Sequence, residues 1–386
     1  MPKRDRWSSD EDEEAPTQNN GDAEQPGGNT AELASSSLQI AGKPCQGSSS
    51  ASPRLGYQLY NPLMRGCRSV YDSYERLTQI DEGTYGVVFK ARDLCTDEIV
   101  AIKQIKFEDE ITKEGFPISA LREISVLLSL SHECIVTVRE MVVGATHDKV
   151  FMVMEQFEMD LQAAMKSGPT ASTPFSQSEV KHMLYQIVSA MDHVHSHWYM
   201  HRDMKTSNIL VHRSGRLALC DFGMARKYQK PARKMTQMVC TLWYRAIELL
   251  FGEDAYGPSV DMWSIGCIFA ELLTKDAILQ GNGELDQVQK VFELLGTPDD
   301  DDWPEFKSLP SAGTFKWRHK AGSDFGKRFQ VNSFNASGQS YLDPAGKDLL
   351  LQLFRMNPAK RISACDAIEH KYFTEGVAKR QPDFFL

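Results

Sequence analysis

The sequence predicts an α+β protein of two lobes, a small strand-rich lobe followed by a larger helical lobe. Three short apolar segments separated by turns are typical of antiparallel strands, and they lie at residues 77–80, 87–91 and 99–105. From residue 180 to residue 194 the apolar side chains instead recur at helical spacing, and residues 258–274 form a second, strongly apolar helix. A hinge between the strand-rich lobe and the helical lobe is predicted at residues 155–158.

The chain divides by composition into four predicted parts. The N-terminal part is rich in Ser, Gly, Pro, Asn and acidic residues, and it holds too few apolar residues to offset the entropy lost on ordering, so we expect it to be disordered. Ser8 and Ser9 precede five acidic residues, which fits an acid-directed phosphorylation site but fits a solvated tail better. The predicted boundaries are a tail at 1–68, a small lobe at 69–154, a large lobe at 155–373 and a C-terminal tail at 374–386.

Length, charge and cysteine usage narrow the class of protein. The 386 residues carry a formal net charge of −9 with a pI of about 5.6, which argues against a nucleic-acid-binding surface and against attachment to anionic membranes. The eight cysteines form no C-x-x-C pair, the pattern of reduced thiols rather than of disulfides or a zinc site. The most apolar run, residues 265–273, is too short to span a bilayer. We therefore expect a soluble intracellular protein that binds neither nucleic acid nor membrane directly.

Residues 201–223, HRDMKTSNILVHRSGRLALCDFG, hold the side chains that phosphoryl transfer needs. That chemistry requires a carboxylate that receives the substrate hydroxyl, a cation near the moving charge, and two oxygen ligands that hold magnesium against a triphosphate. These groups are supplied, in that order, by Asp203, Lys205, Asn208 and Asp221. The apolar segments between the two metal ligands predict a hairpin that brings them side by side. A surface hairpin with scattered charges is the alternative, and it explains the spacing poorly.

A glycine-containing turn in the small lobe is a candidate phosphate-binding loop. Residues 81–86 lie between the first two predicted strands, and the backbone N–H groups near Gly83 and Gly86 could close over phosphates. Asp81 stands where a first glycine is usual, so this turn on its own indicates only a hairpin.

Lys103 strengthens that interpretation because it ends Val-Ala-Ile-Lys on the next strand, at the spacing of a phosphate-binding lysine. A helix is predicted from Pro117 to Leu130, and Glu123 on it would pair with Lys103 and orient it. The alternative for Glu123 is a surface charge on the helix.

Two patterns in the large lobe are interpreted as structural. Ser176 and Glu179 form a capping box at the start of the helix that continues to residue 194. His193, His195 and His197 lie near its end, but only the first and third share a helix face. Locally hydrogen-bonded histidines are therefore favoured over a zinc site.

The order of these motifs from residue 74 to residue 373 resembles the protein kinase family, with all six letters of H-R-D and D-F-G matched. Three stretches are similar more narrowly to the cyclin-dependent kinases: EGFPISALRE at 114–123, TLWYRAIELL at 241–250 and VDMWSIGCIFAELLT at 260–274. PISALRE, TDEIVAIK at 96–103, IVTVREMVVG at 135–144 and HRDMKTSN most resemble the PITSLRE (cyclin-dependent kinase 11) type. The resemblance implies a two-lobed protein kinase fold, ATP and Mg²⁺ as cofactors, and transfer to protein Ser/Thr.

The resemblance assigns roles residue by residue. It implies that Asp203 is the catalytic base, that Lys205 and Thr241 steady the transferring phosphate, and that Asn208 and Asp221 bind the metal. The positions implied to contact ATP or to orient a residue that does are Ile80, Gly83, Gly86, Val88, Ala101, Lys103, Glu123, Met154, Gln156, Asp160 and Leu210.

Regulatory positions follow from the same resemblance. Thr84 and Tyr85 lie in the glycine-containing turn, and Thr236 occupies the place of an activating phosphorylation site. A phosphate there would be bridged by three cations, which are Arg122, Arg202 and Arg226. The alternative is a plain loop threonine with solvated arginines.

Three positions depart from the family pattern. Asp81 puts a negative charge at the phosphate loop, and Gln237 follows Thr236 where close relatives have proline. Ile247 replaces the proline of A-P-E, although Glu248 and its expected partner Arg361 remain.

The resemblance implies a cyclin that docks on the PISALRE helix, with L-type cyclins suggested, and nuclear work in transcription and pre-mRNA splicing, with the cytoplasm as a further location. Val239, Cys240 and Arg245 resemble the segment that selects proline after the acceptor residue. The alternative function is a pseudokinase that scaffolds a cyclin or splicing factors. We favour the active enzyme because the lysine, the glutamate, the metal ligands and the base are all present.

Overall fold

The computed structural model describes residue 7 and residues 66–83, 86–105, 118–144, 149–167, 173–237, 239–313, 325–329 and 342–385. The chain forms two compact units, a smaller one from Met1–Lys106 and Met141–Met152 and a larger one from Phe107–Glu140 and Val153–Leu386. Thr84, Tyr85 and Pro117 lie outside the described residues, as does the predicted disordered tail except for Trp7 and residues 66–68. The predicted lobe boundaries stay predictions.

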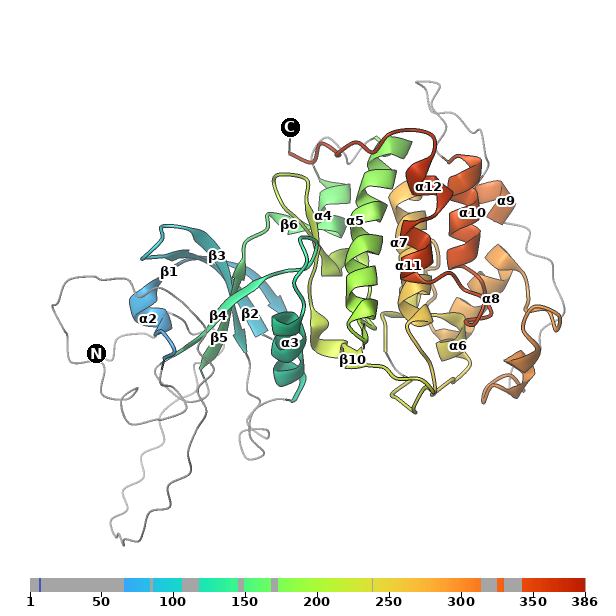
Figure 1. Ribbon diagram of the computed structural model, residues 1–386, viewed down its shortest axis with the longest axis horizontal. Helices are drawn as coiled ribbons and strands as arrows, with labels where there is room; N and C mark the ends of the chain where they lie inside the picture. Colours follow the sequence, from blue (N-terminus) through green and yellow to red (C-terminus); the bar gives the residue numbers. More distant parts are fainter. Residues whose placement is uncertain are drawn as a thin grey trace, which may run out of the picture. The chain divides into compact units, whose positions relative to one another are not determined.

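The small unit contains three whole strands and parts of two more from one five-stranded sheet, in the order β1-β2-β3-β5-β4 (Figure 1). The strands are β1 (Tyr74–Gly83), β2 (Gly86–Asp93), β3 (Ile99–Ile105), β4 (Val138–Val143) and β5 (Val150–Glu155), and the short helix α2 (Val70–Ser73) precedes β1. β2 pairs antiparallel with both β1 and β3, which confirms the three predicted antiparallel strands. β4 was not predicted as a strand, because two charged residues interrupt its apolar pattern.

The two faces of β2 and β3 carry different side chains. Phe89 lies opposite Ile102 in the register, and Ala91 lies opposite Val100; all four are fully buried. We call this the Phe89 face. Because side chains alternate along a strand, the intervening residues of β2 and β3 belong to the other face.

The large unit is mainly helical. Its strands are short: β6 (Met159–Asp160), β7 (Tyr199–Met200), β8 (Ile209–Val211), β9 (Leu217–Leu219) and β10 (Arg226–Lys227). Its longer helices are α3 (Ile118–Ser129), α5 (Gln177–Ser196), α7 (Ser259–Thr274), α8 (Glu284–Leu295) and α10 (Pro344–Leu353). Its shorter helical segments are α4 (Leu161–Lys166), η4 (Thr206–Asn208), η5 (Phe222–Met224), η6 (Leu242–Tyr244), α6 (Ile247–Leu250), η7 (Pro304–Ser308), α9 (Phe325–Arg328), α11 (Ala364–Ile368) and α12 (Lys371–Thr374).

The long helices α5 and α7 supply much of the core of this unit. α5 lies beside both α7 and α11 (Figure 1). The predicted capping box of α5 is confirmed: the Ser176 side chain accepts from the Glu179 N–H, and the Glu179 carboxylate accepts from the Ser176 N–H at 2.8 Å. The predicted apolar face of α5 is buried, and every residue of α7 from Val260 to Leu272 is buried. A helix that is apolar all round is stable only where other elements surround it.

Helix boundaries and number differ in places from the prediction. The apolar run at residues 349–354 predicts a helix, but α10 begins earlier, at Pro344, because Asp343 caps it by accepting from the Gly346 N–H at 2.6 Å. Proline suits the first helical position, where no N–H is needed. α8 was not predicted, although its apolar residues recur at helical spacing among charged ones. In the described part of the chain, no helix is long and apolar enough to cross a bilayer.

The segment 375–385 folds back over the start of α5. The Lys181 ammonium donates to the Glu375 carbonyl at 2.7 Å, and the Arg380 N–H donates to the Ser178 carbonyl at 3.1 Å. Phe384, which is 4% exposed, packs edge-on against Phe175 with ring centroids 5.9 Å apart. These contacts join the segment to the rest of the large unit.

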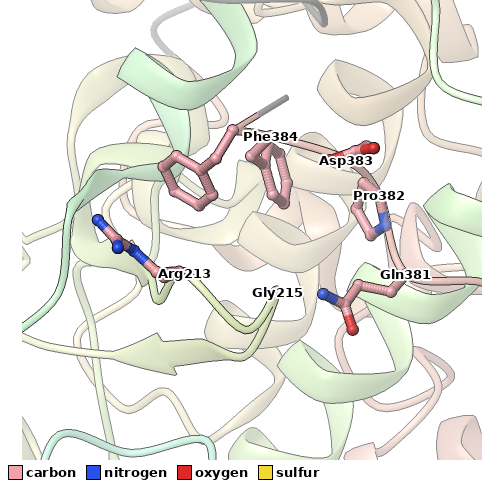
Figure 2. Close-up of a pocket in the computed structure, with 7 residues that line it drawn as sticks. Arg213, Gly215, Gln381, Pro382, Asp383 and Phe384 are labelled. Carbon is pink, nitrogen blue, oxygen red and sulfur yellow. The ribbon is translucent and has the colours of Figure 1, made fainter.

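The same segment also closes over the turn between β8 and β9. Figure 2 shows the Gln381 side chain directed toward Gly215, where φ is +75° and a Cβ would collide with Gln381. A cavity of about 450 Å³ remains, lined by Arg213, Gly215, Gln381, Pro382, Asp383, Phe384 and Phe385. None of the predicted catalytic or metal-binding residues lines this cavity.

Candidate active site

A buried carboxylate on α7 holds the catalytic segment in place. Asp261 is 0% exposed and accepts from the backbone N–H groups of His201 at 2.9 Å and of Arg202 at 2.8 Å. The His195 ring bonds the same carboxylate at 2.9 Å. Burial alone would raise the pKa of Asp261, but the hydrogen bond and charge of His195, with contributions from His201 and Arg202, lower it. Sequence reasoning gave Asp261 no role, although a carboxylate inside an apolar helix was a usable signal.

The three histidines at the end of α5 make local contacts. Besides the bond from His195 to Asp261, the His197 ring bonds the His193 carbonyl at 2.8 Å. The His193 ring accepts from the Ser131 N–H at 3.3 Å. These bonds agree with the structural interpretation of the three residues.

Asp203 is the centre of a polar cluster. One carboxylate oxygen accepts from both the N–H and the hydroxyl of Thr241, each at 3.0 Å. The other lies 2.9 Å from the Lys205 ammonium and accepts from the Asn208 amide at 3.1 Å. The structure therefore brings together four residues that the sequence predicted to act together.

The charge state of Asp203 follows from these contacts. Burial alone would raise its pKa, but the hydrogen bond and charge of Lys205 lower it, with further help from His201 and Thr241. Lys205 also donates to the Thr241 hydroxyl at 3.3 Å, so the ammonium lies between the two oxygen-bearing side chains. An ionised carboxylate beside a positioned cation suits a group that accepts a proton from a substrate hydroxyl.

The predicted hairpin between Asn208 and Asp221 is confirmed. β8 and β9 pair antiparallel with Ile209 opposite Leu219, and the Cys220 N–H donates to the Asn208 carbonyl at 3.0 Å. The two predicted metal ligands therefore flank the same end of the hairpin.

The donor set fits magnesium, a hard cation that prefers oxygen ligands. The Asn208 amide nitrogen donates to the Asp203 carbonyl at 2.8 Å, so its nitrogen is engaged and its oxygen can serve as a ligand. Asp221 has φ of +58°, and its carboxylate lies 3.3 Å from the point that a Cβ on Gly223 would occupy. The absence of a side chain on Gly223 thus leaves room around the carboxylate.

Of the residues in the large unit that were predicted to contact the nucleotide, two pack against the same apolar cluster. Met154 and Leu210 both pack against one buried cluster of Val136, Phe157 and Ala218. Gln156 donates to the neighbouring Phe157 carbonyl. Asp160, predicted to contact the ribose, caps α4 by accepting from the Ala163 N–H at 2.8 Å.

The small unit carries the other predicted nucleotide residues. Val88 lies opposite Lys103 in the register, and both share with Ala101 the side of the sheet away from the Phe89 face. Gly86 has φ of +152°, and a Cβ there would collide with the Gln104 carbonyl, so this turn requires glycine. Ile80 and Gly83 are both in β1, and Ile80 is 46% exposed.

Glu123 lies on α3 in the large unit and is 6% exposed. The helix on which it was expected is confirmed. Its pairing with Lys103 stays a prediction.

The three predicted phosphate-binding arginines gather around η5. Arg122 donates to the Gly223 carbonyl at 3.3 Å, and Arg202 donates to the Met224 carbonyl at 2.8 Å. Burial and the charges of Arg226 and Arg202 lower the pKa of the Arg122 guanidinium. The cations therefore repel one another in a partly buried place that an anion would stabilise.

Thr236, the predicted phosphorylation site, is exposed and tethered through its backbone. The Tyr256 hydroxyl donates to the Thr236 carbonyl at 2.6 Å and accepts from Arg202 at 2.8 Å. Sequence reasoning missed Tyr256, because nothing local marks a tyrosine as the link between two distant loops.

Arg245 organises the segment that follows Thr236. Its guanidinium donates to the carbonyls of Val239 at 3.0 Å and Cys240 at 3.1 Å, and it lies 2.8 Å from the Glu284 carboxylate. Cys240 has φ of +62°, and Val239 is 2% exposed. The carbonyls are thus already engaged by the chain itself.

Comparisons with known proteins agree with this geometry. Residues 74–373 match the protein kinase domain family. Cyclin-dependent kinase G-1 of Oryza sativa subsp. indica is 47% identical over 322 residues, which cover 83% of this chain and 45% of that protein. Cyclin-dependent kinase 11B of Homo sapiens is 44% identical over 84% of this chain and 39% of its own length. The corresponding Rattus norvegicus protein is 42% identical over 84% of this chain and 71% of its own length.

The chain therefore spans about half or less of most of the curated relatives that it matches. The family match nevertheless covers well over half of this chain, and the catalytic segment lies inside it. The chain belongs to the protein kinase family, with cyclin-dependent kinases of the G and 11 (PITSLRE) types among its relatives.

Proposed function

We propose that the chain is a cyclin-dependent protein Ser/Thr kinase that transfers the γ-phosphate of ATP to a protein hydroxyl. The observation that carries this proposal is the cluster of Asp203, Lys205, Thr241 and Asn208, in which a partly buried, ionised carboxylate lies 2.9 Å from an ammonium. Phosphoryl transfer depends on positioning and on electrostatic stabilisation more than on covalent chemistry of the protein.

Each residue of the cluster has a distinct role in the proposal. Asp203 orients the substrate hydroxyl and accepts its proton, while Lys205 stabilises the charge on the transferring phosphoryl group. Thr241 fixes one oxygen of Asp203 through two hydrogen bonds and leaves the orientation of that carboxylate little freedom. Asp261 acts through the backbone of His201 and Arg202 and is a positioning residue.

The cofactors in this proposal are ATP and Mg²⁺. Asn208 and Asp221 would hold the metal, which when bound neutralises charge on the phosphates. Lys103 and the glycine-containing turn would hold the phosphates, with Glu123 orienting the lysine. The adenine would lie among apolar side chains, which are Ile80, Val88, Ala101, Met154 and Leu210.

We expect the preferred acceptor to be followed by proline. An ordinary residue at that position brings a backbone N–H, which loses free energy if it is buried without an acceptor. The Val239 and Cys240 carbonyls already accept hydrogen bonds from Arg245, so they are poor acceptors for that N–H. Proline has no N–H to satisfy.

The proposed protein partner is a cyclin that docks on α3. Three large apolar side chains on this helix are strongly exposed: Ile118 (73%), Leu121 (51%) and Leu128 (63%). Their spacing of three and seven residues puts them on one side of the helix, opposite the buried Glu123. Exposed apolar clusters of this kind mark protein interfaces. An L-type cyclin and nuclear work in transcription or splicing extend the proposal and rest on family resemblance alone.

The scaffold alternative receives no support from the comparisons or from the site. A pseudokinase would be expected to lack a catalytic or metal-binding residue. This chain has all four of them, Asp203, Lys205, Asn208 and Asp221, and the first three contact one another.

The test is phosphate transfer from radiolabelled ATP to a Ser-Pro peptide by the full chain, co-purified with its bound partners from cells. Asp203→Asn should lower kcat by about 10²–10⁴-fold, because the proton acceptor is removed while its contacts are largely kept. Nucleotide binding should persist. Asp276→Asn, at an exposed aspartate of the same unit, is the matched control and should leave kcat unchanged. Wild-type turnover by Asp203→Asn would refute the proposed enzyme.

A further inference from the structure

The small unit buries a tryptophan that lies far from the strands of the sheet in the sequence. Trp7 is 0% exposed and ranks among the largest fully buried side chains, yet the next described residue along the chain is Gly66. It is also the sole aromatic residue among residues 1–56, and five consecutive acidic residues, 10–14, follow it closely. A large ring in so polar a stretch is buried only where a matching apolar surface receives it.

That surface is the Phe89 face of the sheet. The Trp7 ring meets Phe89 of β2 at 5.6 Å between centroids and an interplanar angle of 86°, and it meets Phe151 of β5 at 5.8 Å and 66°. Both phenylalanines are 0% exposed. Edge-to-face contact at this separation is a favoured arrangement of aromatic rings. β2 and β5 flank β3 in the sheet, so the two rings come from strands on either side of a third.

Arg76 places a cation beside this surface. The Arg76 guanidinium of β1 lies 4.1 Å from the centroid of the Phe89 ring. A positive charge beside the aromatic surface complements a tryptophan that is followed in the sequence by acidic residues. The chemistry of the surface thus suits an acidic peptide that carries tryptophan.

This surface is separate from the predicted nucleotide-binding residues. Phe89 follows Val88 on β2, and Ile102 lies between Ala101 and Lys103 on β3. Because successive side chains of a strand point to opposite faces, Val88, Ala101 and Lys103 belong to the other face. A peptide on the Phe89 face would leave those residues uncovered.

We propose that the Phe89 face is an intramolecular docking site for the N-terminal segment of this chain, with Trp7 as its anchor. The occupant is the chain's own tryptophan, seated between Phe89 and Phe151. Tethering raises the local concentration of the segment, so the site is filled in cis ahead of a free peptide of the same sequence.

The first experiment measures binding of a fluorescently labelled peptide of residues 1–14 to full-length chains by anisotropy. The Trp7→Ala chain leaves the site open and should bind the peptide at least about tenfold more tightly than the wild-type chain, whose own Trp7 competes. A Trp7→Ala peptide should not bind measurably. The matched control is the Trp198→Ala chain, which loses a tryptophan that is 52% exposed and should behave as wild type. Equal binding of the peptide to the Trp7→Ala and wild-type chains would overturn the proposal.

A second measurement is made on the wild-type chain, and a conservative variant serves only to assign the resonance. In the full wild-type chain labelled with 5-fluorotryptophan, the Trp7 resonance should resist broadening by a soluble paramagnetic agent, whereas the resonance of exposed Trp198 should broaden. The conservative Trp7→Phe chain identifies the resonance. Equal broadening of both would overturn the proposal, and so would a wild-type dimer that Trp7→Ala converts to a monomer, because Trp7 would then occupy a second copy. Neither measurement uses phosphate transfer, so each can fail while the proposed kinase activity stands.

Discussion

Asp203 shows how a single side chain can be partly buried and still charged. The group's ordinary pKa of 3.8 is lowered in the folded chain, because Lys205, His201 and Thr241 together outweigh the effect of burial. Because its pKa is lowered, Asp203 is protonated, and so stops being a proton acceptor, only at a pH below the usual pKa range of a carboxyl group. Between about pH 5 and pH 8 the carboxylate should therefore stay ionised.

The first prediction concerns this pH dependence. In the wild-type chain, kcat/KM should not fall through protonation of Asp203 at any pH above about 5. In Lys205→Met that fall should begin at a higher pH, because Asp203 stays partly buried after it loses the contact that most lowers its pKa. Stopped-time assays at saturating ATP from pH 5 to pH 8 measure it. An acid limb at the same pH in both chains would contradict the assigned charge state.

The second prediction concerns Thr236. Phosphate on this residue would add nearly two negative charges, and Tyr256 already links the Thr236 carbonyl to Arg202. Arg122 and Arg202 both donate to carbonyls of η5, and Arg226 follows η5 by two residues. Thr236→Ala should lower kcat/KM by about tenfold or more at saturating partner, the equivalent of one charge-assisted hydrogen bond. The comparison is a phosphopeptide map together with initial rates.

A matched background sharpens this test. In an Arg226→Ala chain, Thr236→Ala should change the rate little, because much of the binding site for the phosphate is already lost. Independent, additive effects of the two substitutions would mean that Thr236 and Arg226 do not act through one another.

At the scale of single elements, α3 carries opposite properties on its two sides. Glu123 is buried while Leu121 and Leu128 are exposed. The third prediction is that Leu121→Asp lowers partner-stimulated activity at least about tenfold, because burying a carboxylate against an apolar surface is unfavourable. Initial rates against added partner measure it. Leu285→Asp on α8, at a leucine that is 67% exposed, is the matched control and should respond normally. Equal responses of the two variants would exclude α3 as the docking surface.

The helix α6 is fixed by an ion pair inside the large unit. Glu248 and Arg361 make two parallel hydrogen bonds, 2.7 and 2.8 Å long, with both side chains essentially unexposed. The expected partnership of these residues is thereby confirmed. Ile247 stands at the start of α6 where the family pattern has proline, and it is 0% exposed, so its side chain is buried in the place that proline would occupy.

The fourth prediction is that Arg361→Met lowers the free energy of unfolding by about 3–5 kcal/mol, because it leaves Glu248 buried without its counter-charge. Replacing both residues, as Glu248→Leu with Arg361→Met, should restore part of the loss. Urea denaturation of the single and double variants measures the coupling. Lys307→Met, which removes an exposed ion pair with Asp300, should change stability by less than about 1 kcal/mol. A loss of similar size at Lys307 would contradict this account.

For the whole molecule, local periodicity predicted the elements whose packing is simple. The alternating strand β2, the one-sided α5 and the largely apolar α7 each have a pattern that follows from where their side chains are buried. β4 was missed because two charged residues interrupt its apolar pattern, and α8 was missed although its apolar residues recur at helical spacing. Their positions depend on neighbours distant in sequence, which local patterns do not reveal.

The candidate site divides in the same way. Asp203, Lys205, Asn208 and Asp221 lie within one short stretch, so their spacing alone predicted the cluster and the hairpin. Asp261 and Tyr256 act on this stretch from other parts of the chain, and only the folded structure shows their hydrogen bonds to it. Trp7 is the extreme case, because a segment predicted to be disordered contributes one of the largest buried side chains.

The folded-back segment 375–385 has a consequence for biosynthesis. α5 is made early, but Lys181, which is 1% exposed, finds the Glu375 carbonyl only after 194 further residues have been translated. At about 5–20 residues per second this interval lasts roughly 10–40 seconds, during which the start of α5 and Phe175 lack their final cover. A ribosome that stalls within that interval would present an apolar surface to chaperones, whereas a chain whose residues 375–385 have emerged could close the large unit.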